Sequence, residues 1–290
     1  MRNVLISSAL LMIGGLFFVI NDGIINFLSP KGIQFYHFVF YGTPTYLLLL
    51  LYLILKGDLK KELKTTNYFI PLFRGLLFAP MPFITFLALR NISLPEYTTL
   101  NMSSPFIASI FAIFFLKEKI NILLFIAILF GLMGVLFVVQ PGFDNFNIFY
   151  LLVLFGALII TGTTVIVNKY NNVTGPIGYF IYGGIFTHLL SFIFFIFDPL
   201  LFDFKTLCLI IISSIFINAA LLCTGISFQR SQKYYASIFC LVYIQILWSI
   251  LVGYYIFNEY LNFYATIGAL FIFISGLFSI PSQQKQINAK

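Results

Sequence analysis

Asp22 is the acid best placed to do chemistry, because it stands inside a long apolar stretch near the N-terminus. Asn21 precedes it and Asn26 follows four positions later, so Asp22 and Asn26 share one face if the stretch is helical. An ionised side chain within hydrocarbon costs roughly 2.5–3.5 kcal/mol at a helix centre, so an acid there needs a role. Two roles stay open: a carboxylate that binds a proton or cation at the mouth of a cavity, or an interfacial acid that bonds a nearby helix end.

A second group of polar residues is uncharged. Thr98, Asn101 and Pro105 recur at steps of three and four and are expected to share a helix face, and Pro105 frees a backbone carbonyl from its helical bond. Helix packing in membranes uses small hydroxyl residues and accounts for Ser103 and Ser104. It accounts less well for the larger amide of Asn101, so we expect Thr98 and Asn101 in a cavity wall.

The stretch after residue 240 offers a corresponding set, namely Tyr243, Gln245 and Trp248, the last being the single tryptophan of the chain. Large polar groups gain little from packing alone, and aromatic rings can stack on an organic solute or hold a cation. We therefore predict that these three residues also bind substrate.

The two histidines, His37 and His188, could shuttle a proton because histidine titrates near neutral pH. A lone histidine within a helix can equally bond a neighbouring helix. His37 joins Asp22 as a candidate for ion or proton coupling.

Three charged residues are interpreted as structural. Glu118 lies between Lys117 and Lys119, and Glu259 closes a later apolar run; both are expected to fasten the turn to the next helix. Arg74 is expected at the cytoplasmic end of a helix, among the basic residues that orient the chain. Its alternative role is a bidentate contact with a substrate carboxylate or phosphate.

The elements that must position these residues are membrane helices. Of the 290 residues, 61% are hydrophobic and 9% charged, whereas roughly a quarter of a soluble domain is charged. The net charge of +7 comes mostly from short loops between apolar runs, so no basic face for nucleic acid is expected. The three cysteines lie inside apolar runs without CxxC spacing, and neither a disulfide framework nor a metal site is expected.

Apolar runs long enough to cross a bilayer, about 20 residues each, recur along the whole chain. They fall at 4–27, 33–55, 68–89, 95–116, 121–140, 148–168, 177–197, 206–228, 234–257 and 261–280. Pro80 and Pro82 are expected to bend the third. The first run has no small-x-small cleavage site and is interpreted as a spanning helix.

Orientation follows from the loops. With the N-terminus in the cytoplasm, twelve lysines and arginines fall on the cytoplasmic side and three on the other. This bias predicts a multi-pass inner-membrane protein with both termini in the cytoplasm, including a short polar tail at 282–290.

The two halves of the chain repeat. Phe-Phe-Leu-Lys-Glu ending at Glu118 recurs as Tyr-Ile-Phe-Asn-Glu ending at Glu259, 141 positions later, and glycines follow each. Five helices per half place the second half in the membrane upside down, an arrangement typical of secondary transporters. We therefore expect an all-α membrane protein of ten transmembrane helices in two inverted five-helix repeats, 1–143 and 144–281.

At this point the chain resembles a known family. Arg74-Gly75-Leu76-Leu77, Ala88-Leu89, Thr98-Thr99, Ser104-Pro105 and the two endings at Glu118 and Glu259 are similar to the EamA family of the drug/metabolite transporter superfamily. The resemblance covers essentially the whole chain. It implies transport without ATP or a bound cofactor, by proton-coupled exporters, exchangers or facilitators.

Asn21-Asp22 resembles in particular a branch that includes S-adenosylmethionine uptake carriers. Relatives in that branch often carry an arginine where Tyr41 stands and an acid where Gln245 stands. Tyr41 is therefore counted among the candidate substrate-binding residues, and the two departures bear on which substrate charges the cavity tolerates.

The predicted function is a secondary transporter that moves a small organic metabolite, an amino acid or related compound, across the inner membrane by alternating access. Carriage of S-adenosylmethionine or a nucleotide-like metabolite is the alternative. An integral-membrane enzyme would need clustered acids, histidines or serine–base pairs, which are absent from the sequence, and a channel would need rings of like residues from several subunits. Expected partners are a small-molecule substrate and lipid; a homodimer is left open.

Overall fold

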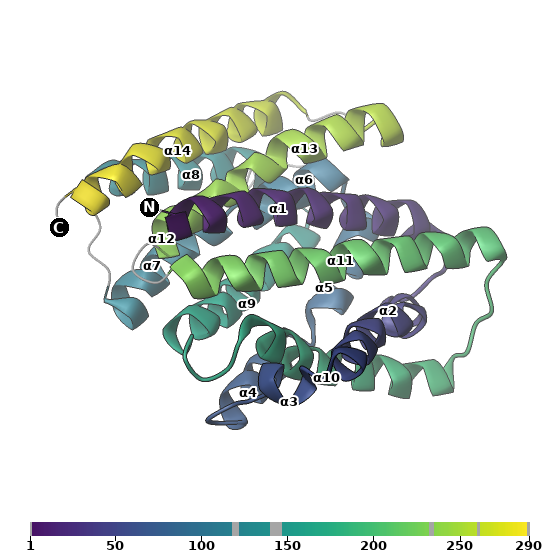
Figure 1. Ribbon diagram of the computed structural model, residues 1–290. Coiled ribbons are helices and arrows are strands. Elements are labelled where there is room, and N and C mark those ends of the chain that lie inside the picture. The colour runs from purple at the N-terminus through teal and green to yellow at the C-terminus, as the bar shows by residue number, and fades with distance from the viewer. Residues whose placement is uncertain (1, 118–121, 140–146, 232–234, 260–261, 289–290) are drawn as a thin grey trace.

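The computed structural model describes residues 2–117, 122–139, 147–231, 235–259 and 262–288. Within these ranges the chain is mostly helical and forms no named strand; two residues, Thr65 and Thr174, make an isolated β-bridge. The helices run roughly along one another in an elongated bundle (Figure 1). The expectation of an all-α membrane protein is confirmed.

The helices of the first half follow the predicted apolar runs, with several divided in two. They are α1 (Arg2–Leu28), η1 (Ser29–Lys31), α2 (Phe35–Lys56), α3 (Leu59–Glu62), α4 (Phe69–Phe78), α5 (Met81–Asn91), α6 (Leu94–Asn101), α7 (Ser104–Leu116) and α8 (Ile122–Val139).

The second half continues in the same manner. Its helices are α9 (Phe149–Lys169), α10 (Pro176–Phe197), α11 (Phe204–Ser231), α12 (Tyr235–Phe239), the 3-10 turn η3 (Cys240–Tyr243), α13 (Ile244–Val252), the π-helical turn η4 (Gly253–Phe257) and α14 (Phe263–Asn288).

Eight helical segments of the described chain are long and apolar enough to cross a membrane. The two other predicted spans, 121–140 and 261–280, coincide with α8 and α14, whose apolar stretches Phe125–Gly134 and Phe263–Ser275 are shorter. The described residues therefore show eight of the ten predicted spans, together with two further apolar helices.

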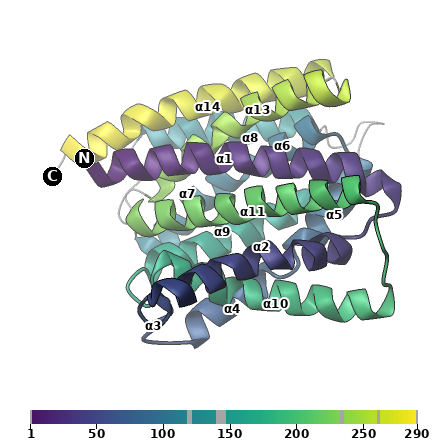
Figure 2. The ribbon, with the colours of Figure 1, turned by 45° about the vertical axis from the view of Figure 1, so that its right-hand side comes forward.

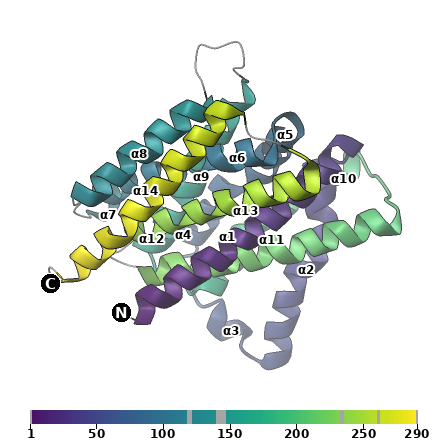
Figure 3. The same cartoon turned by 90° about the horizontal axis from the view of Figure 1, so that it is seen from above.

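The helices that lie side by side come from different halves of the chain. α1 packs along α11, α4 against α10, and α8 against α14 (Figures 2 and 3). Large apolar side chains cover the outside of the bundle, for example Leu48, Leu51 and Leu55 on α2. Such a surface suits lipid rather than water.

Prolines explain where two of the predicted helices divide. Pro80 stands between α4 and α5, and α7 starts with Pro105 in its first turn. Pro105 has no N–H to bond the carbonyl of Asn101, and the Ser104 hydroxyl donates to that carbonyl instead. The expectation that Thr98, Asn101 and Pro105 share one continuous helix is therefore wrong, because α6 ends at Asn101.

Candidate substrate cavity

A cavity of about 220 Å³ lies inside the bundle and is lined from both halves of the chain. The first half contributes residues of α1, α2, α4, α5, α6 and α7, and the second half contributes residues of α9 to α13. No described residue of α8 or α14 lines it. These two helices therefore pack outside the helices that form the cavity wall.

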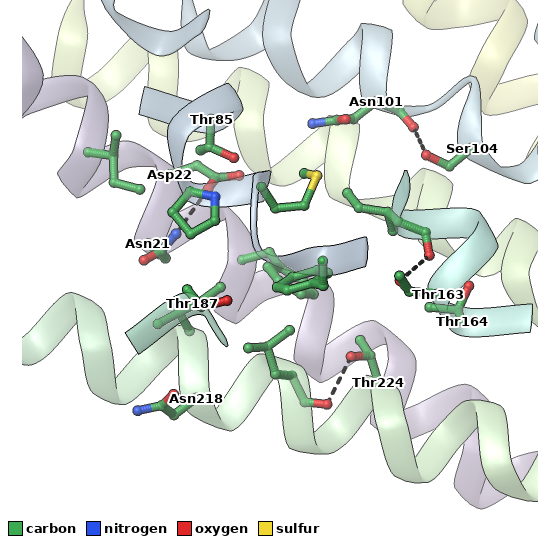
Figure 4. Close-up of a pocket in the computed structure, with 18 of the residues that line it drawn as sticks. Asn21, Asp22, Thr85, Asn101, Ser104, Thr163, Thr164, Thr187, Asn218 and Thr224 are labelled. Atoms are coloured by element: carbon green, nitrogen blue, oxygen red, sulfur yellow. Dashed lines mark hydrogen bonds between the residues drawn. The ribbon is translucent and has the colours of Figure 1, made fainter. Parts of the chain in front are cut away.

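The wall is mixed in character: apolar and aromatic side chains alternate with the polar ones that Figure 4 labels. Its aromatic members include Phe18, Phe38, Phe78, Phe86, Tyr97, Phe228 and Phe239. Its other polar and charged members are Asn21, Asp22, Arg74, Thr85, Asn101, Ser104, Thr163, Thr164, Thr187, His188, Ser214, Asn218, Thr224 and Gln245. A few placed polar groups in an apolar wall are typical of sites that bind a small organic molecule.

Asp22 lies in this wall, as the sequence predicted for a coupling carboxylate. Its Oδ1 accepts a hydrogen bond of 3.0 Å from the Asn21 amide, whose own Oδ1 accepts one of 2.7 Å from Ser213 on α11. Asp22 makes no ion pair with any described residue. Asn26 does not join it in the cavity, because the Asn26 amide donates to Glu259 instead.

Asn101 and Gln245 also line the cavity, one from each half of the chain. Gln245 fits because Gly15 on α1 has no side chain: a Cβ on Gly15 would come within 2.7 Å of the Gln245 Cγ. Close approach at Gly15 thus lets a large amide side chain lie across α1.

The structure places four other predicted substrate-binding residues outside the lining. Thr98 and Tyr243 are buried between helices, and the Tyr243 hydroxyl faces Gly131 on α8. Tyr41 donates a 2.8 Å hydrogen bond to the carbonyl of Leu200, and Trp248 on α13 is not a lining residue. The packing of the helices against one another decides where these side chains lie, and residue spacing along the chain does not reveal that packing.

Of the two histidines, His37 was the predicted coupling residue, but His188 is the one that lines the cavity. His37 lies outside the cavity, where its Nε2 contacts the carbonyl of Asp198 at 2.7 Å and a carboxylate oxygen of Asp198 at 3.7 Å. His188 lines the cavity, with Nδ1 2.9 Å from the Thr43 hydroxyl. The position of His37 fits a tie between α2 and the segment after α10 better than a role in coupling.

Of the three charges interpreted as structural, Glu118 lies outside the described residues. Glu259 accepts hydrogen bonds from the Asn26 amide at 2.9 Å and from the backbone N–H of Leu94 at 3.0 Å. It therefore joins α1 to the first turn of α6, rather than to the helix that follows it.

The expected place of Arg74 is wrong. Arg74 is the sixth residue of α4, and its side chain lines the cavity instead of extending from a helix end. The guanidinium carbon lies 4.9 Å from the centre of the Phe78 ring. Gly75 and Gly183 allow α4 and α10 to cross closely, and this crossing draws Arg74 inward.

The sequence reasoning missed most of the hydroxyl and amide groups of the second half. On α11 these are Ser214, Asn218 and Thr224, which line the cavity together with Ile217 and Leu221. Together these five positions recur at steps of three and four, which marks one helix face, so the signal was present in the sequence. Thr163, Thr164 and Thr187 are short side chains of the same kind on α9 and α10.

Comparison with known proteins agrees with this architecture. Residues 3–140 match the model of the EamA-like transporter family. The chain is 26% identical over 284 residues to an S-adenosylmethionine uptake transporter of Rickettsia conorii, an alignment that covers 93% of this chain and 90% of that protein. A crystal structure with 15% sequence identity and a TM-score of 0.68 covers 96% of this chain and 99% of its own, which shows a shared fold.

Proposed function

We propose that the chain is a membrane transporter rather than an enzyme, and that it moves a small organic metabolite by alternating access. The match of residues 3–140 to the EamA-like transporter family and the relative named as an uptake transporter support this proposal. The observation that carries this proposal is the cavity between the halves, lined by both and holding Asp22, Asn101 and Gln245. A site shared by two halves can face either side of the membrane when one half rocks against the other.

The proposed architecture is ten spans in two inverted repeats, 1–143 and 144–281. The ten proposed spans are numbered in chain order. Span three consists of α4 and α5, span four of α6 and α7, and span nine of the segments from α12 to η4; the other spans are α1, α2, α8, α9, α10, α11 and α14. In an inverted repeat, each span corresponds to the span five places away, so contacts should occur in matching pairs. Span one contacts span eight, and their counterparts, spans six and three, are also in contact. Span four contacts span six, and their counterparts, spans nine and one, are in contact as well. Spans two and seven, four and nine, and five and ten each contact their own counterpart.

Single residues support the same exchange. Lys117 and Asn258, 141 positions apart, are the non-glycine residues with positive φ in the described chain, at 55° and 54°. Between α8 and α14, Ser275 bonds the carbonyl of Ala127, and Gly134 approaches the carbonyl of Gly268. A shift of 141 converts one of these contacts into the other.

The proposed location is the inner membrane with both chain ends in the cytoplasm. The start of α1 and the end of α14 lie at the same end of the bundle, as an even number of spans requires (Figure 1). α3, which carries Lys60 and Lys61, lies at that end too (Figure 2). A basic loop beside both ends favours the cytoplasmic side for them.

Transport assays in proteoliposomes test the proposal. The purified chain is reconstituted, and uptake and counterflow of a panel of amino acids, nucleosides and related metabolites are measured with and without a pH gradient. We expect saturable uptake of at least one solute, stimulated by the same solute on the opposite side. Flux that never saturates, or no counterflow for any solute, contradicts a carrier.

A second candidate substrate is S-adenosylmethionine, favoured by the relative named for its uptake. Tyr41 and Gln245 are uncharged at positions where the resembling uptake branch often carries an arginine and an acid, respectively. Of the two residues, only Gln245 lies in the cavity wall. Counterflow with labelled S-adenosylmethionine decides this candidate directly, because a carrier of this compound exchanges it against itself.

A further inference from the structure

Two polar atoms of the cavity wall are buried without a hydrogen-bond partner among the described residues: the Nε of Arg74 and the hydroxyl of Thr187. They belong to different halves, Arg74 to α4 and Thr187 to α10. Both residues also line a smaller cavity of about 70 Å³ that shares part of the same wall. An unsatisfied buried donor costs free energy, so two of them in one cavity indicate an absent acceptor.

The guanidinium of Arg74 has no carboxylate partner. The ion pairs among the described residues join His37 to Asp198 and Lys56 to Asp58, both away from Arg74. The ring of Phe78 lies 4.9 Å from the guanidinium carbon, and the guanidinium Nε has no hydrogen-bond partner among the described residues. A buried cation without a counter-charge is expensive unless an anion comes to it.

The Arg74 guanidinium lies beside Gly183, which has no side chain. A Cβ on Gly183 would come within 2.5 Å of an Nη atom of Arg74, so the guanidinium occupies space that any other residue at 183 would fill. The neighbouring wall groups are already engaged: His188 with Thr43, and the Asn218 amide with Thr45. The donors that remain free therefore point to an oxyanion as the missing group, because guanidinium and hydroxyl both donate to it.

We propose that Arg74 and Thr187 form an anion-binding subsite for the carboxylate of the transported metabolite. Asp22 lies in the same cavity and offers the opposite charge, so the substrate class that fits both is a zwitterion of the α-amino acid type. The proposal rests on the proposed function, since the anion is taken to be part of the cargo.

Binding measured apart from transport tests the subsite. Thermal unfolding of the purified chain is followed with matched pairs that differ only in the anion: each common amino acid and its amide, S-adenosylmethionine and its decarboxylated form, and nucleoside monophosphates with their nucleosides. At least one carboxylate should raise the melting temperature while its neutral partner does not. Stabilisation by phosphates alone, by neutral solutes alone, or by none of the panel overturns the proposal.

The variants assign the effect to these residues. Arg74→Gln should weaken binding of the stabilising carboxylate by about tenfold to a hundredfold, the loss typical of a charge-assisted hydrogen bond, and Arg74→Lys should restore part of it. Thr187→Val should weaken binding by less. Its matched control is Thr266→Val on α14, because Thr266 lies outside the cavity wall and its hydroxyl already bonds the carbonyl of Asn262.

Equal affinity in wild type, Arg74→Gln and Thr187→Val overturns the subsite even if transport is found. Failure of counterflow with binding still dependent on Arg74 removes the transport function and leaves the subsite. The two proposals therefore fail separately. Should Arg74→Gln not fold, Thr187→Val against Thr266→Val gives the same comparison with a smaller change.

Discussion

Among the described residues, the carboxylate of Asp22 has one hydrogen-bond partner, the amide of Asn21, and it lines the cavity. The other titratable or charged residues that line the cavity are Arg74, Tyr97 and His188. Asn21 is itself fixed by Ser213, so the carboxylate is oriented by α11 although it belongs to α1. A carboxylate held in this way can bind a proton or cation in one state of a transport cycle and release it in the other.

Asp22→Asn should abolish the dependence of uptake on a pH gradient, or abolish uptake, while the protein still accumulates in the membrane. The amide keeps the size of the side chain and removes its charge and its proton. Uptake is measured in proteoliposomes across a range of pH, with Asp203→Asn, an exposed acid before α11, as the control. Normal uptake with the wild-type pH profile rules out coupling through Asp22.

At the scale of single residues, the sequence located polar groups but not their directions. Asp22, Asn101 and Gln245 were predicted and do line the cavity, whereas Thr98 and Tyr243 are buried between helices. Asn101 lines the cavity and Thr98 does not, and this difference depends on where α6 ends. Arg74 lines the cavity instead of extending from a helix end, and this depends on how closely α4 and α10 cross. Both are properties of packing and not of spacing.

At the scale of helices, Glu259 links three segments. It accepts from Asn26 on α1 and from the first N–H of α6, and it follows the αL residue Asn258 that ends η4. The N-terminus of a helix has unbonded N–H groups and favours negative charge, so a carboxylate there is stabilising.

Glu259→Gln should lower the stability of the folded protein by about 1–3 kcal/mol, because the amide accepts less well at the N–H of Leu94 and at Asn26. The loss is measured as a shift in thermal or denaturant unfolding in detergent. Glu62→Gln, in the short helix α3, serves as control. An unchanged unfolding midpoint in Glu259→Gln would show that these two bonds contribute no net stability.

The crossing of α4 and α10 depends on a pair of glycines. A Cβ on Gly75 would lie 2.8 Å from both the Cα and the carbonyl oxygen of Gly183, a backbone contact that cannot yield by a side-chain rotation. Small residues at such crossings let the backbones of membrane helices approach.

Gly75→Ala should therefore destabilise the protein by about 1–3 kcal/mol through overpacking, and should disturb Arg74 next to it. Gly225→Ala on α11 is the matched control, because a Cβ there meets nothing within 4 Å. Thermal unfolding of the two variants is compared in the same detergent. Equal stability of Gly75→Ala and Gly225→Ala contradicts a close crossing at this point.

The helices themselves were largely predictable. Apolar length is a local property of the chain, and eight of the predicted runs are helices long enough to span a bilayer. The helix breaks at Pro80 and after Asn101 were only partly predictable. The prolines indicate where a helix is disturbed, but whether a proline bends or ends the helix depends on whether the freed carbonyl finds another hydrogen-bond partner. Ser104 supplies that partner at Asn101.

At the scale of the whole molecule, the cavity exists because spans of one half lie against spans of the other. Asn26 and Glu259 join the halves on one side of it, and the pairs His188 with Thr43 and Asn218 with Thr45 join them elsewhere. In alternating access, some of these contacts between halves must break on each cycle, whereas contacts within a half are kept.

A covalent link between the halves should therefore stop transport, while a link within one half should not. In a background without the native cysteines, Asn26→Cys with Glu259→Cys is joined by a short cross-linker that forms a disulfide with each thiol, and counterflow is measured before and after reduction. The control pair is Asn168→Cys with Ser231→Cys, both in the second half, whose side chains bond at 3.0 Å. We expect at least a tenfold loss of counterflow in the first pair, restored by reductant, and none in the second. Full counterflow through a completely linked first pair would mean that these halves do not separate at Glu259, and that the cavity opens by another movement.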